Sequence, residues 1–95
     1  MKMMIVIVKD NESEALTRAL IGAQYRVTGI SSTGGFLRSG VTTLLIGVED
    51  AQVDAATELI RTSLNASRSR SEHAEDPAGK RATLFVVPVS RFEQV

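Results

Sequence analysis

Apolar and polar residues alternate in distinct blocks along the chain. Four short apolar runs, at residues 3–8, 25–30, 41–48 and 83–89, are rich in β-branched side chains, which is typical of strands. Two longer stretches between these runs repeat apolar residues every three or four positions, which predicts helices. The predicted order is therefore strand, helix, strand, strand, helix, strand.

Each predicted helix has a start signal and an apolar face. Asn11 can cap the first helix, with Glu14 three residues later in the spacing of a capping box, and Gly22 marks its end. Glu49 or Asp50 begins the second helix. The apolar faces consist of Ala15, Leu16, Ala19, Leu20 and Ala23 in the first helix, and of Val53, Ala56, Leu59, Ile60 and Leu64 in the second.

This order of elements predicts an α+β, ferredoxin-like βαββαβ fold, in which a four-stranded antiparallel sheet carries two helices on one face. The chain of 95 residues is long enough for one domain and too short for two, so residues 1–95 are expected to form a single domain. Residues 66–80 contain few large apolar side chains and are expected to form a flexible loop.

The first and fourth strands are apolar on both faces, whereas a sheet with one face in water should alternate. The two sets are Met3, Ile5 and Ile7 against Met4, Val6 and Val8 in the first strand, and Phe85, Val87 and Val89 against Leu84, Val86 and Pro88 in the fourth. Because both helices cover the same face, another surface has to cover the other. The simplest cover for so small a domain is another copy of itself, so we expect a homo-oligomer packed through the open face of the sheet.

Composition narrows the range of partners. Formal net charge is zero, which argues against duplex nucleic acid or an anionic membrane as a partner. There is no cysteine, and the single histidine, His73, lies in a polar segment with no second metal ligand at suitable spacing. The first apolar run is too short for a signal peptide or a membrane span, so a cytoplasmic setting is expected.

The sequence does not indicate catalysis. No histidine, cysteine or carboxylate pair stands where acid–base or nucleophilic chemistry would need it. Asp10, Glu12 and Glu14 are interpreted as first-turn charges that the helix dipole favours. We therefore expect a protein that is not an enzyme and needs no metal or cofactor.

The segment STGGFLRSG, between the second and third strands, is longer than a hairpin needs. Gly34 and Gly35 can adopt backbone angles closed to other residues, which lets a ligand approach the main chain. Hydroxyls, guanidinium groups and apolar surface surround them: Thr28, Thr33 and Ser39, then Arg26 and Arg38, then Phe36 and Leu37. These are the components of a nucleotide site, with phosphate donors beside a stacking surface. The alternative is a hairpin connection that its phenylalanine merely anchors.

The motif STGGFLRSGVTT, followed by an apolar strand that ends in GV, resembles the hallmark of one branch of the PII-like signalling proteins, the cyclic di-AMP receptors. The similarity extends over nearly the whole chain. It includes MKMMIVIVKDNESEALTRAL at the start, YRVTGISSTGGFLRSGVTTLLIGVED in the middle and ATLFVVPVSRFEQV at the end.

The resemblance implies a homotrimer that binds cyclic di-AMP in the clefts between neighbouring subunits. By position, one subunit would contribute Arg26, Thr28, Gly35, Phe36, Leu37 and Gly47, and its neighbour would contribute Phe85 for stacking and Gln94 for an adenine edge. Proteins of this kind act as sensors, because ligand binding shifts loops that contact a protein target. The target of this chain is unknown from its sequence.

Three features depart from the family pattern. Val41 stands where the family commonly has an asparagine that reads an adenine, and Gly29 stands where it usually has a lysine. The long loop before the last strand is shortened to residues 66–80. Two alternatives therefore remain: the same fold and site could bind another nucleotide, or the trimer could be a structural adaptor without a ligand.

Overall fold

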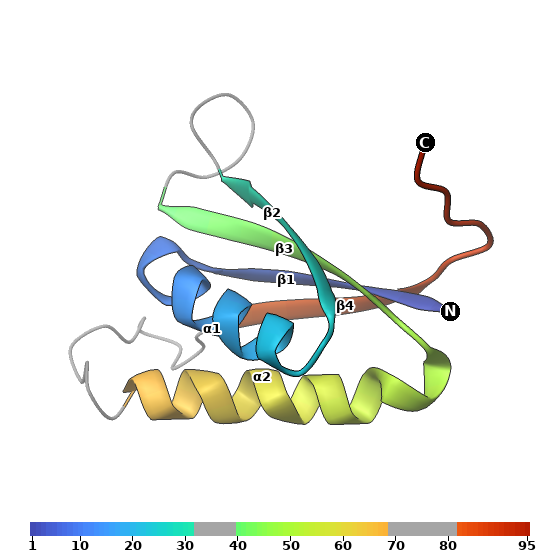
Figure 1. Cartoon of the computed structure of the whole chain (residues 1–95). Helices are drawn as coiled ribbons and strands as arrows, with labels where there is room; N and C mark the ends of the chain where they lie inside the picture. Colours follow the sequence, from blue (N-terminus) through green and yellow to red (C-terminus); the bar gives the residue numbers. More distant parts are fainter. Residues whose placement is uncertain (32–39, 69–81) are drawn as a thin grey trace.

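The computed structural model describes residues 1–31, 40–68 and 82–95. Its elements are β1 (Lys2–Lys9), α1 (Asp10–Gly22), β2 (Arg26–Ser31), β3 (Val41–Val48), the 3₁₀ turn η1 (Asp50–Gln52), α2 (Val53–Arg68) and β4 (Ala82–Pro88). The strands form one antiparallel sheet in the order β2-β3-β1-β4. Both helices lie on the same face of this sheet (Figure 1). The predicted ferredoxin-like βαββαβ fold is confirmed.

The first helix begins differently from the prediction. Its N-cap is Lys9, without a side-chain cap, so the predicted cap at Asn11 is wrong. The Asp10 N–H donates to the Gly40 carbonyl at 2.9 Å, and the Thr42 hydroxyl donates to Asp10 Oδ1 at 2.5 Å. These two bonds tie the start of α1 to the start of β3, so the chain is already helical when it reaches Asn11.

The hydrophobic core lies between the sheet and the helices. Its buried side chains are Met4, Val6, Val8, Leu16, Leu20, Leu44, Ile46, Val48, Ala56, Ile60 and Leu64. Glu12 lies in the first turn of α1, as interpreted from the sequence, and it is buried there, with only 3% of its surface exposed. Glu12 precedes Leu16 by one helical turn, and Leu16 precedes Leu20 by another, so all three lie on the face of α1 that meets the sheet.

The second helix starts through a reciprocal cap and runs further than predicted. The Glu49 N–H donates to Gln52 Oε1 at 2.8 Å, and the Glu49 side chain caps the turn in return. The apolar stripe expected for α2 is confirmed, because its members are buried or pack against the core. However, α2 continues to Arg68, so residues 66–68 of the predicted loop are helical, and the rest of that predicted loop lies outside the described residues.

The sheet face opposite the helices carries a second apolar surface. Strand register aligns its side chains in three rows: Arg26, Gly47, Met3 and Val87; Thr28, Leu45, Ile5 and Phe85; Ile30, Thr43, Ile7 and Thr83. Exposure is high at the two edges of the sheet, where Phe85 is 52% exposed and Ile30 is 41% exposed. Strands apolar on both faces are thus confirmed, and neither α1 nor α2 covers this open face.

Two neighbouring residues of α1 give a matched test of the packing. Leu20 is fully buried, whereas Ile21 is 57% exposed. Leu20→Ala should lower the free energy of unfolding by about 2–5 kcal/mol, because it removes core contacts and leaves a cavity. Ile21→Ala should change it by less than about 0.5 kcal/mol. Urea denaturation followed by circular dichroism measures both values, and equal losses would contradict the helix face described above.

Candidate functional site

The C-terminal tail after β4 crosses the open face of the sheet. It leaves the edge strand β4 beside the first residue, where the Val89 N–H donates to the Met1 carbonyl at 3.1 Å. It reaches the opposite edge strand, β2, where Arg26 Nη1 donates to Gln94 Oε1 at 2.9 Å. The tail therefore spans the sheet on the side away from the helices, as Figure 1 shows.

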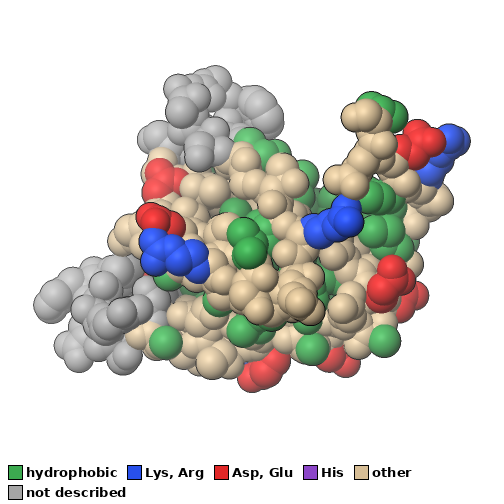
Figure 2. Space-filling view, in the orientation of Figure 1, with side chains coloured by type: hydrophobic (Ala, Val, Ile, Leu, Met, Phe, Trp, Pro, Cys, Tyr) green, Lys and Arg blue, Asp and Glu red, His purple; other side chains and the backbone are tan. Residues whose placement is uncertain are grey.

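An open pocket of about 890 Å³ lies between the tail and the sheet. Its lining comes from the adjoining ends of β1, β2 and β3, from the turn before α2 and from the tail itself. Figure 2 shows the tail standing away from the body of the molecule, with a hollow between them. This volume falls within the range of about 300–1,000 Å³ that is usual for small-molecule sites.

Gly47 forms part of the pocket floor. It pairs with Arg26 across β2 and with Met3 across β1, so it interrupts a row of side chains on the open face. A Cβ atom at this position would meet only the Met1 Cε atom, at 3.5 Å, which is an ordinary contact. Packing within the described chain therefore does not require glycine here. The missing side chain instead leaves room for a ligand to approach the strand.

Two polar groups of β2 line the pocket. Arg26 and Thr28 are two residues apart, so both project from the open face, and both are exposed. A guanidinium group presents a fork of N–H donors that matches the oxygens of phosphate or carboxylate, and a nearby hydroxyl adds a further donor. This edge of the pocket is suited to an anion.

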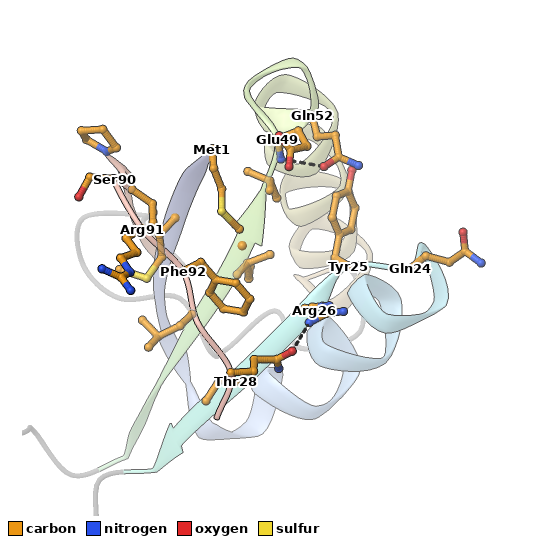
Figure 3. A pocket seen from close by; sticks show the side chains of 18 residues that line it. Met1, Gln24, Tyr25, Arg26, Thr28, Glu49, Gln52, Ser90, Arg91 and Phe92 are labelled. Atoms are coloured by element: carbon orange, nitrogen blue, oxygen red, sulfur yellow. Dashed lines mark hydrogen bonds between the residues drawn. The ribbon is translucent and has the colours of Figure 1, made fainter.

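Several residues of the tail line the pocket. Phe92 and Gln94 are among them. Within the tail, Arg91 Nη2 donates a hydrogen bond to Glu93 Oε1 at 2.5 Å. In Figure 3 the Phe92 ring turns into the pocket, and Arg91, which also lines it, projects from the other side of the tail. The tail thus presents one aromatic ring and one amide to the same space.

An ion pair fixes the rim of the pocket at the N-terminus. The Met1 amino group lies 3.0 Å from Asp50 Oδ1, and Met1 also lines the pocket. The hydrogen bond from this amino group, together with its positive charge, lowers the pKa of Asp50 from its usual value of 3.8. Because the folded-state pKa is lowered, the pair stabilises the fold above the unfolded pKa, and this contribution is lost as the pH falls through the folded pKa. Since Asp50 is exposed, the contribution is small.

Four of the residues that the sequence assigns to ligand binding meet in this pocket. They are Arg26, Thr28, Gly47 and Gln94. Gln94 bonds Arg26 of its own chain, whereas the family resemblance assigns it to the site of a neighbouring subunit, which stays a prediction.

The remaining predicted ligand residues lie elsewhere. Val41 is at the opposite end of β3 from Gly47 and pairs with Lys9. Phe85 lies on β4, half-exposed on the open face, and does not line the pocket. The loop residues Thr33, Gly34, Gly35, Phe36 and Leu37 lie outside the described part of the chain.

Gly29 lies on the other side of the sheet from the pocket. It pairs with the buried Leu44, and a Cβ atom at position 29 would meet the Leu44 Cδ2 atom at 3.6 Å. Its neighbours Thr28 and Ile30 project from the open face, so residue 29 faces the helices. Glycine in place of the family's lysine therefore removes no cation from this pocket.

Sequence reasoning missed Phe92 as a pocket residue. The segment RFEQ contained a usable signal, because Phe92 and Gln94 are two residues apart and must share a side in an extended tail. What the sequence could not supply was the path of the tail across the sheet.

The structure adds two findings on other kinds of site. Within residues 1–31, 40–68 and 82–95, no group of three or more histidine, cysteine, aspartate or glutamate side chains could hold a metal ion. Across the same ranges, neither helix is long and apolar enough to cross a membrane.

The bond between Arg26 and Gln94 should hold the end of the tail. Arg26→Ala removes this bond without changing the tail sequence, so a carboxypeptidase should release Val95 and Gln94 about tenfold faster, as expected for a hydrogen bond to a charged group. The control is Arg18→Ala, which removes an exposed arginine that pairs with Glu14 on α1, and it should leave the rate unchanged. Equal rates in both variants would mean that this bond does not restrain the tail.

Comparison with known proteins identifies the family of the chain. Residues 1–95, the whole chain, match the family described as "Cyclic-di-AMP receptor". Among solved structures, the chain is similar to a functionally unknown protein from Pediococcus pentosaceus ATCC 25745, with 34% sequence identity and a TM-score of 0.68. That similarity covers 99% of this chain and 96% of the other. The resemblance read from the sequence is confirmed, and this chain belongs to the cyclic-di-AMP receptor family.

Proposed function

We propose that this protein is a PII-like sensor that binds cyclic di-AMP in inter-subunit clefts of a homotrimer. The observation that carries the proposal is the meeting of Arg26, Thr28, Gly47 and Gln94 around one pocket, in a chain that belongs to the cyclic-di-AMP receptor family. These residues come from β2, from β3 and from the tail, so the fold gathers them from distant parts of the sequence.

The chemistry of the pocket fits a phosphate-linked nucleotide. Arg26 can donate to phosphate oxygens, with Thr28 beside it, and each hydrogen bond to a charged phosphate contributes about 1.5–3 kcal/mol. The floor at Gly47 lets the ligand lie against the strand. In the free chain Gln94 accepts one of the Arg26 hydrogen bonds, so a phosphate that takes this donor would release the amide to contact another part of the ligand.

The uncovered sheet face supports the homotrimer. Its apolar rows include Phe85, which is 52% exposed and therefore available to a neighbouring subunit. Copies of the chain packed through these faces would remove the apolar surface from water and bring the pocket of one subunit close to Phe85 of the next. The ligand would then lie between subunits.

The protein would transmit a signal and carry out no reaction. A ligand that binds one arrangement of the loops and the tail more tightly shifts the population towards it, and a protein target reads the change. We place this activity in the cytoplasm.

A second candidate ligand follows from Val41. This residue begins β3 with an apolar side chain, so a base edge that faced it would lose a hydrogen-bond partner at a cost of about 1–3 kcal/mol. Because Val41 lies at the opposite end of β3 from Gly47, this cost would apply to a ligand that extends along the strand beyond the described pocket, and the same fold would then favour a nucleotide other than cyclic di-AMP.

Calorimetric titration tests the proposal. Cyclic di-AMP should saturate the wild-type protein at about one ligand per subunit, while cyclic di-GMP, ATP and AMP should not bind. Arg26→Ala should weaken binding by at least about tenfold, because it removes charge-assisted hydrogen bonds. Arg18→Ala is the matched control and should bind as the wild type does.

Two results would contradict the proposal. Saturation by another nucleotide alone would favour the second candidate ligand. Heat from none of the four compounds, with a folded protein, would mean that the fold is kept for a structural role.

A further inference from the structure

We propose that Phe92 stacks against a nucleobase in this pocket and is the aromatic contact that the tail contributes to ligand binding. The inference rests on the proposed function and names a contact surface of the same site. Neither the family motif nor the predicted ligand residues include Phe92.

The Phe92 ring is exposed to solvent and faces the pocket. Phe92 is 54% exposed, yet it lines the pocket and turns into it (Figure 3). A large aromatic side chain in this state leaves apolar surface in water, and a flat partner on its exposed surface would remove that surface. Nucleobases are such partners, because every base has a flat π-face.

Two hydrogen bonds hold the ring over the pocket. On one side of Phe92, the Val89 N–H is bonded to the Met1 carbonyl, and on the other, Gln94 is bonded to Arg26. Both anchors lie within three residues of Phe92, so the tail between them has little freedom to carry the ring away. An aromatic surface restrained in this way loses less conformational freedom when it binds.

The opposite wall suits the base itself. Gly47 has no side chain to fill the floor, and Leu45 supplies apolar surface in the next row. A base between the floor and the Phe92 ring would have an apolar contact on each side. Arg26 stands at the edge of the same pocket, where a phosphate attached to the base would lie.

Other aromatic residues do not supply this surface within the described chain. Phe85 is outside the pocket lining, and Tyr25, which does line it, is partly buried against the core. Phe92 is therefore the pocket aromatic with the more accessible ring.

A single tryptophan makes the contact measurable. The chain has no tryptophan, so Phe92→Trp introduces one fluorophore while keeping an aromatic ring at the site. Titration with cyclic di-AMP should change its emission in step with the calorimetric saturation. Ile21→Trp is the control, because it places the fluorophore at an exposed position of α1 outside the pocket lining. The emission of this variant should stay constant.

Affinity gives the second readout. Phe92→Ala should weaken binding of cyclic di-AMP by about tenfold or more, in the range measured for base stacking, while Phe92→Tyr should keep near wild-type affinity. Glu93→Ala changes the adjacent tail residue that does not line the pocket, and should have little effect.

Different results would contradict the receptor function and the stacking role of Phe92. If the wild-type protein binds none of the nucleotides, the proposed function is wrong, and the role of Phe92 falls with it. If the wild type binds cyclic di-AMP, but Phe92→Ala binds equally well and the emission of Phe92→Trp stays constant, the receptor function stands and the stacking role is overturned.

Discussion

A sheet that is apolar on both faces, with helices on only one of them, is the constraint from which the rest of the structure follows. One face of β1 packs Met4, Val6 and Val8 into the core, and the other presents Met3, Ile5 and Ile7. The first set is fully covered by α1 and α2, whereas the second is only half-buried. Exposed apolar surface of this extent is unfavourable in water, so the open face favours contact with other surfaces.

The C-terminal tail and the pocket are consequences of that open face. At one end of the sheet, the row that contains Gly47 has a gap, and the tail passes above it to reach Arg26. The gap, the guanidinium group and the Phe92 ring meet at this point because three separate parts of the chain are bonded together there. The fold thus leaves, at this end of the open face, a place that is both hollow and polar.

The sequence predicted the parts of the structure that depend on periodicity. Strands, the stripe of α2 and the shared face of Arg26 and Thr28 follow from repeats of two or about four residues. The prediction failed where residues distant in the sequence decide the structure. The first helix begins at Asp10, before Asn11, because Asp10 is hydrogen-bonded to Thr42 and Gly40. The role of Phe92 was hidden for the same reason, since it depends on where Val89 and Gln94 attach the tail.

The most direct test of the account is the mass of the ligand-free protein in solution. If copies of the chain cover the open face, sedimentation equilibrium at micromolar concentration should give three times the chain mass of 10.2 kDa. A single species at 10.2 kDa would show that the apolar face stays open in water. That result would contradict both the packing argument and the inter-subunit site.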